Sequence, residues 1–251
     1  MNTLVTILFF TFLASILSLF LVGILLFKEE LMKKFSFSLV SFAAGALLAT
    51  GFLDTMKETI EKGGDNAFLW IAISFAAFFV IERLFIFIHH HGEEDKKALE
   101  DEMRLPVGFL LSGDGMHNFI DGISIATSFL VSFPLGLVTA TAVFIHEIPH
   151  ELGDFGILIH KGYGRWKVFG FNFLTGVLAI LGALIAFYVG SFFEKIIPVM
   201  LAITTANFLY LSATDLLPEI HTKAKRSLAF NETFFFILGI LLIWGLIKLL
   251  G

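Results

Sequence analysis

The sequence has no cysteine, only 5 prolines and a small share of charged residues. The missing cysteines exclude a disulfide framework and a thiolate metal site, and they argue against Cu(I) as a bound metal ion. Charged residues make up 16% of the 251 residues, whereas a soluble domain usually carries about a quarter. So little charge, with a net charge of -5, excludes an ordinary soluble enzyme and a basic nucleic-acid-binding domain.

Hydrophobic residues are abundant: they make up 57% of the chain, and the mean hydropathy is +0.88. This composition indicates a polytopic membrane protein, in which each helical crossing needs about 20 apolar residues. Because the apolar runs are continuous rather than alternating, we expect an all-α fold without strands. The sequence predicts eight transmembrane helices, at about 4–27, 35–56, 67–88, 106–131, 135–160, 168–193, 196–217 and 230–247.

The connections between these spans are short, so residues 1–251 are expected to form a single transmembrane domain. The longest soluble stretch is about 89–105. Pro106 and Pro198 stand where helices should start, as proline prefers. Phe133-Pro134 indicates a very short turn between the fourth and fifth spans.

Basic residues are distributed unequally between the two ends of the predicted spans. The cytoplasmic side of a membrane protein carries the excess of Lys and Arg, and the connections after odd-numbered spans hold most of the 17. We therefore expect both termini outside and the 89–105 loop in the cytoplasm. The proposed cytoplasmic side holds Lys28, Lys33, Lys34, Arg83, Lys96, Lys97, Arg104, Lys161, Arg165, Lys167, Lys223, Lys225 and Arg226, and the other side holds Lys57, Lys62, Lys195 and Lys248.

The fourth and fifth spans carry many acids and histidines but no Lys or Arg. Buried carboxylates are costly unless they are protonated, paired or bound to a metal. Protonated acids in a hydrogen-bonded helix bundle are one interpretation, and a cation that arrives as the ligand is the other. The accompanying imidazoles favour the cation. The residues are Asp114, His117, Asp121, His146, Glu147, His150, Glu151 and Asp154.

Their spacing places these residues on facing sides of two helices. His117 and Asp121 are four residues apart, and so are His146 and His150, so each pair shares a helix face. The two spans form an antiparallel hairpin that turns near Ser132, and residues equally far from the turn lie at equal depth. His117 is then level with Glu147, Asn118 with His146, and Asp114 with His150. The sequence therefore predicts a metal centre near the bilayer midplane.

These residues also carry a family resemblance. The fourth span resembles the HNFxDG signature of the ZIP (ZRT/IRT-like) metal transporters in His117-Asn118-Phe119-Ile120-Asp121-Gly122. The fifth span is similar to that family's HExPHExGD signature in His146-Glu147-Ile148-Pro149-His150-Glu151-Leu152-Gly153-Asp154. Both motifs lie on the spans where the family has them. The resemblance implies a bundle of three, two and three helices, in which the outer triplets are inverted repeats, and it implies a homodimer.

The resemblance further implies a two-metal centre. The residues that match the first metal's ligands are His117, Asp121, His146 and His150. The residues that match positions at or beside the second metal are Asn118, Glu147 and Glu151, and Asp121 or His150 is able to bridge the two metals. Some bacterial relatives have a further carboxylate ligand in the sixth span, where this chain has Ala179, so a weaker or differently built second site is expected.

Ligand chemistry and the resemblance together predict the cargo and the direction of transport. Imidazole and carboxylate groups suit Zn(II) and also Fe(II), Mn(II) and Cd(II). We expect zinc as the substrate, with iron or manganese as the alternative, and by resemblance we expect uptake into the cytoplasm across a plasma (inner) membrane. Metal ions and lipid are the expected partners, and nucleic acid is not.

Further acids and histidines flank the predicted centre along a transport pathway. Asp54 and Glu58 share a D-x-x-x-E spacing with Asp215 and Glu219, which gives the inverted repeat some independent support. These acids either relay cations at the two mouths or are ordinary solvated helix ends. Asp114 and Asp154 extend the central cluster, and His221 is either an exit ligand or interfacial. His89, His90 and His91 either bind metal weakly in the loop or belong to a solvated linker.

One enzymatic interpretation competes with transport. The fifth span also contains the H-E-x-x-H pattern of zinc proteases, in which both histidines bind one ion and the glutamate is a general base. Pro149 interrupts the regular turn that such a motif needs, although the proline itself is either a packing kink or a functional bend. Because the adjacent span carries a second motif, which resembles that of the metal transporters, we expect that the protein is not an enzyme. A metal receptor without flux is the remaining rival.

Overall fold

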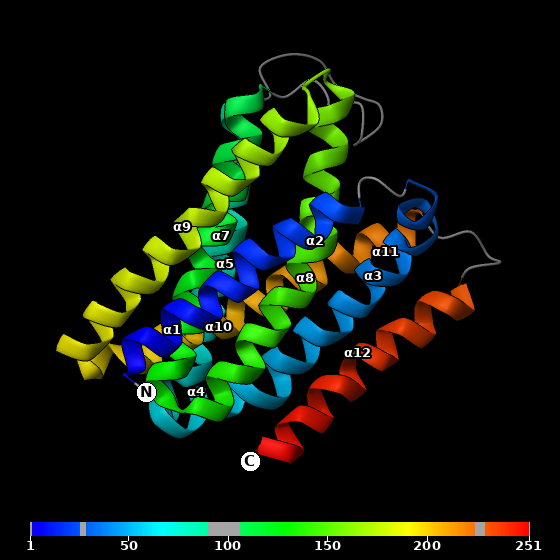
Figure 1. Ribbon diagram of the computed structural model, residues 1–251. Helices are drawn as coiled ribbons and strands as arrows, with labels where there is room; N and C mark the ends of the chain where they lie inside the picture. The colour runs from blue at the N-terminus through cyan, green and yellow to red at the C-terminus, as the bar shows by residue number, and fades with distance from the viewer. Residues whose placement is uncertain (1, 26–28, 90–105, 224–228, 251) are drawn as a thin grey trace.

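The regular structure of the protein is helical throughout the described part of the chain, which confirms the all-α class. Each predicted span lies on a helix, and the two ends of the chain lie at the same end of the bundle (Figure 1). The computed structural model describes the backbone of residues 2–25, 29–89, 106–223 and 229–250, and the side chains of residues 2–24, 37–84, 106–221 and 230–250.

The N-terminal part contains three helical stretches before the 90–105 segment. The first is α1 (Thr3–Phe12), continued by the π-helix η1 (Leu13–Leu17) and α2 (Ser18–Leu25). The second is α3 (Glu29–Ala49), continued by the π-helix η2 (Thr50–Thr55) and α4 (Met56–Gly63). The third follows the short 3-10 turn η3 (Gly64–Asn66) and is α5 (Ala67–His89).

The C-terminal part contains the remaining long helices. They are α7 (Val107–Val131), α8 (Phe133–His160), α9 (Arg165–Phe192), the 3-10 turn η4 (Glu194–Ile196), α10 (Ile197–Tyr210), the π-helix η5 (Leu211–Leu216), α11 (Leu217–Lys223) and α12 (Ala229–Leu250).

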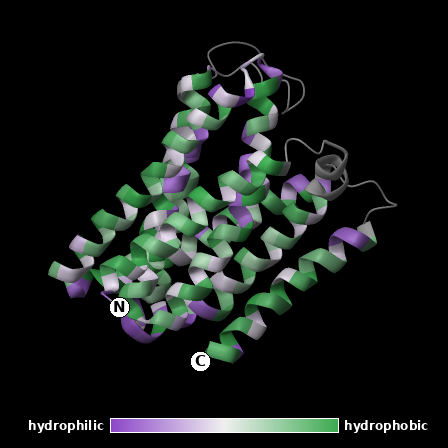
Figure 2. Cartoon of the chain, in the orientation of Figure 1, coloured by the Kyte–Doolittle hydropathy of each residue, from purple (hydrophilic) through white to green (hydrophobic). Residues whose placement is uncertain are grey.

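Several of these helices are long and apolar enough to cross a membrane. Figure 2 shows α12, for example, coloured as hydrophobic over most of its length. Helices α7 and α8 are long enough, but polar side chains interrupt their apolar sequence, so they are not among these helices. That α7 and α8 also span the membrane stays a prediction. The 5 selected stretches are Thr3–Ile24, Phe37–Leu84, Arg165–Phe192, Glu194–His221 and Phe230–Leu250.

The turn between α7 and α8 is even shorter than expected. Ser132 alone separates the two helices, with an extended backbone (φ −161°, ψ 156°). Its side-chain oxygen accepts a hydrogen bond from the backbone N–H of Leu135 at 3.3 Å, which caps α8, so Phe133 and Pro134 already belong to α8. Pro106 and Pro198 begin helices as predicted, at the N-cap of α7 and in the first turn of α10.

Two glycines allow α9 to lie directly against α7. A Cβ atom at Gly122 would collide with the carbonyl oxygen of Ala179, and one at Gly182 would collide with the carbonyl oxygen of Phe119. Backbones that approach this closely need small residues at the contact. The contact lies directly beside the HNFxDG segment and holds α9 behind it.

The π-helices η2 and η5 lie in two distant parts of the chain and share a length and the position of an aspartate. Each has six residues, Thr50–Thr55 and Leu211–Leu216, and the fifth residue of each is an aspartate, Asp54 and Asp215. A π-helix inserts an extra residue into a helical turn and often marks a functional site.

Candidate metal centre

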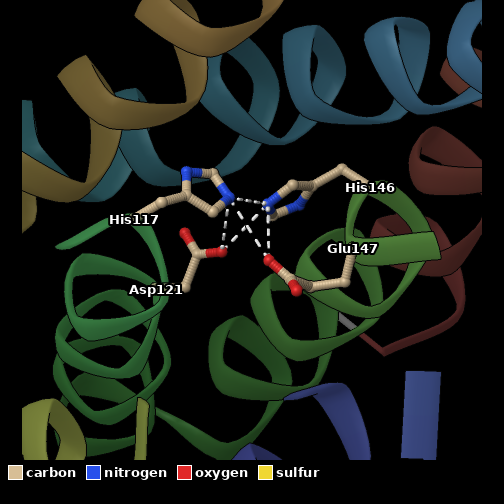
Figure 3. Close-up of side chains that lie close together, drawn as sticks. All are labelled: His117, Asp121, His146 and Glu147. Carbon is tan, nitrogen blue, oxygen red and sulfur yellow. Dashed lines mark hydrogen bonds and ion pairs between the residues drawn. The ribbon is translucent and has the colours of Figure 1, made fainter. Parts of the chain in front are cut away.

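Helices α7 and α8 bring two histidines and two carboxylates together near the middle of the bundle. His117 and Asp121 come from α7, and His146 and Glu147 come from α8; these four residues are called the first centre (Figure 3). Their ligand atoms all lie within 4.8 Å of one another. The depth relation across the hairpin therefore holds, since His117 Nε2 lies 3.2 Å from Glu147 Oε1.

The spacing of these atoms matches the size of a zinc coordination shell. His117 Nε2 lies 3.1 Å from His146 Nε2 and 3.4 Å from Asp121 Oδ2. His146 Nε2 lies 2.9 Å from Asp121 Oδ2 and 3.6 Å from Glu147 Oε1. Four ligand atoms at about 2.0–2.1 Å from a tetrahedral zinc ion lie about 3.3–3.4 Å from each other. One ion at the middle of the first centre would therefore reach all four residues.

The first centre is buried and rich in negative charge. The side chains of Asp121, His146 and Glu147 are at most 3% exposed, and His117 is 11% exposed. Both carboxylate oxygens of Glu147 are buried and accept no hydrogen bond. In the described part of the chain, the ion pairs of Asp121 and Glu147 involve histidine alone. A buried carboxylate without a basic partner is stabilised by a bound cation.

His146 is oriented to present one nitrogen to this centre. Its Nδ1 atom lies 3.1 Å from the carbonyl oxygen of Ala142, one turn earlier in α8. A carbonyl oxygen only accepts hydrogen bonds, so Nδ1 carries the proton and donates it there. The lone pair of Nε2 then faces Asp121 and Glu147, which is the usual arrangement of a histidine that binds a metal.

Helix α10 contributes a residue that the sequence did not single out. The amide of Asn207 donates a hydrogen bond to Asp121 Oδ1 at 3.1 Å, and Asn207 is buried. This bond leaves Oδ2 of Asp121 turned toward the histidines. An asparagine in a largely apolar span was a detectable signal, but its partner depends on how α10 packs against α7.

His150 does not join the first centre. Its Nδ1 atom lies 3.8 Å from Asp114 Oδ1 and 3.6 Å from Asp154 Oδ2, and the ligand atoms of these three residues form a second cluster within 4.8 Å. We call Asp114, His150 and Asp154 the second group. Since His146 and His150 point to different clusters, the HEIPH segment does not have the arrangement of a zinc protease, in which both histidines bind one ion.

The other residues expected around a second metal have different surroundings. Asn118 Oδ1 accepts a hydrogen bond from the Ser15 hydroxyl at 2.9 Å, and its amide donates to Asp114 Oδ1 at 2.8 Å. Glu151 is buried, and neither of its carboxylate oxygens accepts a hydrogen bond. Ala179 is buried in the tight contact between α9 and α7.

The other residues predicted for the transport pathway are not among the four ligands of the first centre. Asp54 is half-buried, and its Oδ2 atom accepts no hydrogen bond. Asp215 accepts a hydrogen bond from the Thr214 hydroxyl at 2.8 Å. His221 is exposed, with Nδ1 2.9 Å from the Leu217 carbonyl oxygen, and Glu219 lies half-buried in α11. The loop histidines His90 and His91 and the side chain of His89 lie outside the described residues.

The fold and the first centre together define a class: a multi-pass, all-α membrane protein with a His–carboxylate metal centre between two adjacent helices. A family model described as "ZIP Zinc transporter" matches residues 89–247 of this chain. This chain belongs to the ZIP family, which confirms the resemblance of its two motifs. The family consists of transporters and not of enzymes, so the metalloprotease interpretation is set aside.

Individual relatives show the same family. Zinc transporter ZIP13 of Mus musculus is 31% identical over 226 residues, which cover 72% of this chain and 62% of that protein. Zinc transporter ZIP6 of Homo sapiens is 33% identical over 168 residues, covering 65% of this chain and 22% of that protein. Zinc transporter ZIP10 of Homo sapiens is 40% identical over 111 residues, covering 44% and 13%. The chain thus spans less than two thirds of the length of these curated relatives.

Proposed function

We propose that this protein transports zinc across a membrane through the first centre, in the direction of uptake into the cytoplasm. The observation that carries the proposal is the geometry of four ligand atoms, in which each of the two imidazole nitrogens lies between 2.9 and 3.6 Å from the other nitrogen and from both carboxylate oxygens. Such a set binds a dehydrated divalent ion, and its place near the middle of α7 and α8 suits an ion that crosses a bilayer. The relatives named zinc transporters support the same substrate.

Ligand chemistry narrows the cargo without restricting it to one metal. Two imidazoles beside two carboxylates suit Zn(II), and they also accept Fe(II), Mn(II) and Cd(II). Mg(II) and Ca(II) prefer shells made of oxygen atoms, so histidine ligands disfavour them. Zinc is the proposed cargo, and iron or manganese is the alternative.

We also propose the membrane arrangement that the sequence predicts: eight spans, both termini outside, and inverted triplets of helices around the α7–α8 hairpin. The shared position of Asp54 and Asp215 within the six-residue π-helices η2 and η5 supports the repeat. In an inverted repeat these corresponding acids face opposite mouths of the pathway. Asp54 is then proposed to receive the ion outside, and Asp215, Glu219 and His221 to pass it on inside.

The proposals of a homodimer and of a plasma (inner) membrane location rest on the family resemblance. So does a second metal bound beside the first by Asn118, Glu147 and Glu151, with Asp121 or His150 as a bridge. The masses of detergent-solubilised particles would test the dimer, because a monomer and a dimer of a 27.9 kDa chain differ twofold in protein mass.

A flux assay with competing metals tests transport and substrate together. The purified protein is reconstituted into liposomes that contain a zinc-sensitive dye, and zinc is added outside. Zinc-dependent fluorescence that saturates with zinc concentration, and that excess Cd(II) slows more than excess Mg(II), is the expected result. A signal no faster than that of protein-free liposomes would contradict transport, and stronger competition by Fe(II) or Mn(II) than by Cd(II) would favour the alternative cargo.

A further inference from the structure

A cavity of about 560 Å³ lies between the last turn of α4, the end of α7 and the connection from α9 to α10. These segments lie at the same end of the bundle as the N-terminus (Figure 1). The volume is in the range of small-molecule binding sites, about 300–1,000 Å³. The residues of the first centre and of the second group do not line the cavity, so the proposed metal chemistry does not account for it.

Two opposite charges line this cavity from different segments of the chain. Lys62 comes from the last turn of α4, and Glu194 is the first residue of η4. Both residues are exposed, and in the part of the chain that the structure describes neither forms an ion pair. One carboxylate beside an ammonium group is a poor site for a divalent cation, because the charge of Lys62 repels it. The pair instead suits a ligand that carries both an anionic and a cationic group.

Much of the remaining wall of the cavity is apolar. Leu130 and Val131 line it from α7, and Ile197 and Pro198 line it from α10. Gly190 of α9 allows α7 to approach, because a Cβ atom at this position would lie 2.5 Å from Leu130 Cδ1. Charged groups beside an apolar wall suit the part of a phospholipid at which its head meets its acyl chains.

The cavity also lies where the membrane surface is expected. Helix α9 belongs to the stretch Arg165–Phe192 and α10 to the stretch Glu194–His221, and both stretches are long and apolar enough to cross a membrane. The cavity is at the boundary between these two stretches. It is therefore at the level of the lipid headgroups rather than in the hydrocarbon core.

A stripe of exposed apolar side chains on α9 leads from the cavity towards the middle of the membrane. Because they are spaced by three or four residues, its members share one face of the helix; they are Leu181, Ile185, Tyr188 and Phe192. Ser191 lines the cavity and lies beside the stripe, three residues after Tyr188. At 1.5 Å per residue the stripe is about 16 Å long, close to the thickness of one leaflet of the hydrocarbon core.

The polar groups at the cavity favour one kind of headgroup. The ammonium group of Lys62 is suited to a phosphate. The carboxylate of Glu194 and the hydroxyl of Ser191 accept hydrogen bonds, and the end of α9 adds partial negative charge. A primary ammonium group can donate N–H bonds to these acceptors, whereas the quaternary ammonium of choline has none to donate. A glycerol headgroup brings no positive charge to Glu194.

We propose that this cavity binds the headgroup of a phospholipid with a primary amine, such as phosphatidylethanolamine, and that an acyl chain of the lipid lies along the stripe on α9. The phosphate contacts Lys62, and the ammonium group contacts Glu194 and Ser191. The bound lipid joins α4 to the ends of α7 and α9. This proposal rests on the membrane class of the protein and is independent of zinc transport.

Competition between lipids, measured by native mass spectrometry, tests the site. The full chain in detergent is mixed with equal amounts of phosphatidylethanolamine, phosphatidylcholine and phosphatidylglycerol that carry the same acyl chains, and the lipid that stays bound is identified by its mass. We expect one molecule of phosphatidylethanolamine per chain, retained about 10-fold more than phosphatidylcholine, which lacks the charge-assisted hydrogen bonds. Equal retention of the three lipids, or preference for phosphatidylglycerol, would overturn the proposal.

Variants of exposed residues locate the bound lipid at the cavity. Lys62→Gln and Glu194→Gln should each lower the retention of phosphatidylethanolamine about 10-fold while the gel-filtration profile stays unchanged. The matched controls are Glu61→Gln and Lys195→Gln, because these exposed neighbours do not line the cavity, and they should retain the lipid. Ser191→Trp keeps both charges but fills the cavity, so it should also prevent retention. Undiminished retention in both Lys62→Gln and Glu194→Gln would overturn the proposal.

Phosphoethanolamine tests the part played by the stripe, because it has the same charged groups but no acyl chains. In equal amount it should not displace phosphatidylethanolamine from the protein. Displacement would show that the cavity takes a soluble zwitterion, and it would overturn the lipid site. The outcome is separable from that of the flux assay, since a chain that retains phosphatidylethanolamine selectively but moves no zinc would contradict transport and leave the lipid site standing.

Discussion

The first centre and the second group are built by the same two helices, one turn apart, and yet they differ in burial and in ligand number. The first centre has four ligand atoms, with side chains between 0% and 11% exposed, whereas the second group has three, two of them on side chains that are 34% and 22% exposed. The difference teaches that i, i+4 spacing along α8 directs successive side chains into clusters at different depths, which differ in how far they are exposed.

Different neighbours orient the two clusters. Asn207 of α10 holds Asp121 in the first centre, while Ser15 of η1 acts through Asn118 to hold Asp114 in the second group. Second-shell partners of this kind typically change metal affinity 10–100-fold when they are lost. Each cluster can therefore be perturbed from a helix that contributes no ligand to it, which makes the comparison testable without removing a ligand.

The largest expected effect comes from removing a ligand of the first centre. His146→Ala should weaken zinc binding at the first centre at least about 100-fold, because a direct ligand costs more than the partner that orients it. Calorimetric titration measures the change. The control His160→Ala removes an exposed histidine from the last residue of the same helix and should leave the zinc affinity unchanged. Equal losses in the two variants would show that the effect does not come from the first centre.

A smaller effect is expected from the residue that positions Asp121. Asn207→Ala should weaken zinc binding at the first centre about 10-fold, since the lost hydrogen bond of 3.1 Å reaches Asp121. The matched control is Asn231→Ala, because Asn231 of α12 donates to Ser38 of α3, and neither residue belongs to the two clusters. The same zinc affinity in Asn207→Ala and Asn231→Ala would show that this hydrogen bond does not position Asp121 for the ion.

The smallest effect is expected from the remote partner of the second group. Ser15→Ala removes the hydrogen bond to Asn118 and should weaken zinc binding at the first centre by at most about 3- to 5-fold, the effect of about 1 kcal/mol for one hydrogen bond. Ser18→Ala is the control, since that buried hydroxyl donates only to the Ser15 carbonyl oxygen of its own helix. A loss as large as that in Asn207→Ala would assign Asn118 to the first centre instead.

Much of the fold and of the first centre follows from local sequence patterns. Hydropathy located most helix ends to within three residues, but it missed the start of α3 at Glu29, the end of α4 at Gly63 and the end of α11 at Lys223. The hairpin around Ser132 placed His117 level with Glu147 and Asp114 level with His150, as the structure has them. Both successes rest on the same physical ground: helix periodicity and an antiparallel turn fix which residues share a depth.

The remaining features depend on long-range packing or on a single extra residue. Asn207 and Ser15 reach the clusters from α10 and η1, and no periodicity within α7 or α8 encodes those partners. The π-helices insert one residue into a turn, which hydropathy averaged over a span does not detect. Which cluster His150 joins is set by the direction of its ring, and the family motif does not specify that direction.

The central claim is that zinc crosses the membrane by way of the first centre, and the uptake rate of a His117 variant tests it most directly. Wild type, His117→Ala and His160→Ala are reconstituted at equal density into liposomes that contain a zinc-sensitive dye. We predict the same initial rate of zinc entry for wild type and His160→Ala, and a rate for His117→Ala that matches protein-free liposomes. Wild-type uptake by His117→Ala would contradict transport by way of the first centre.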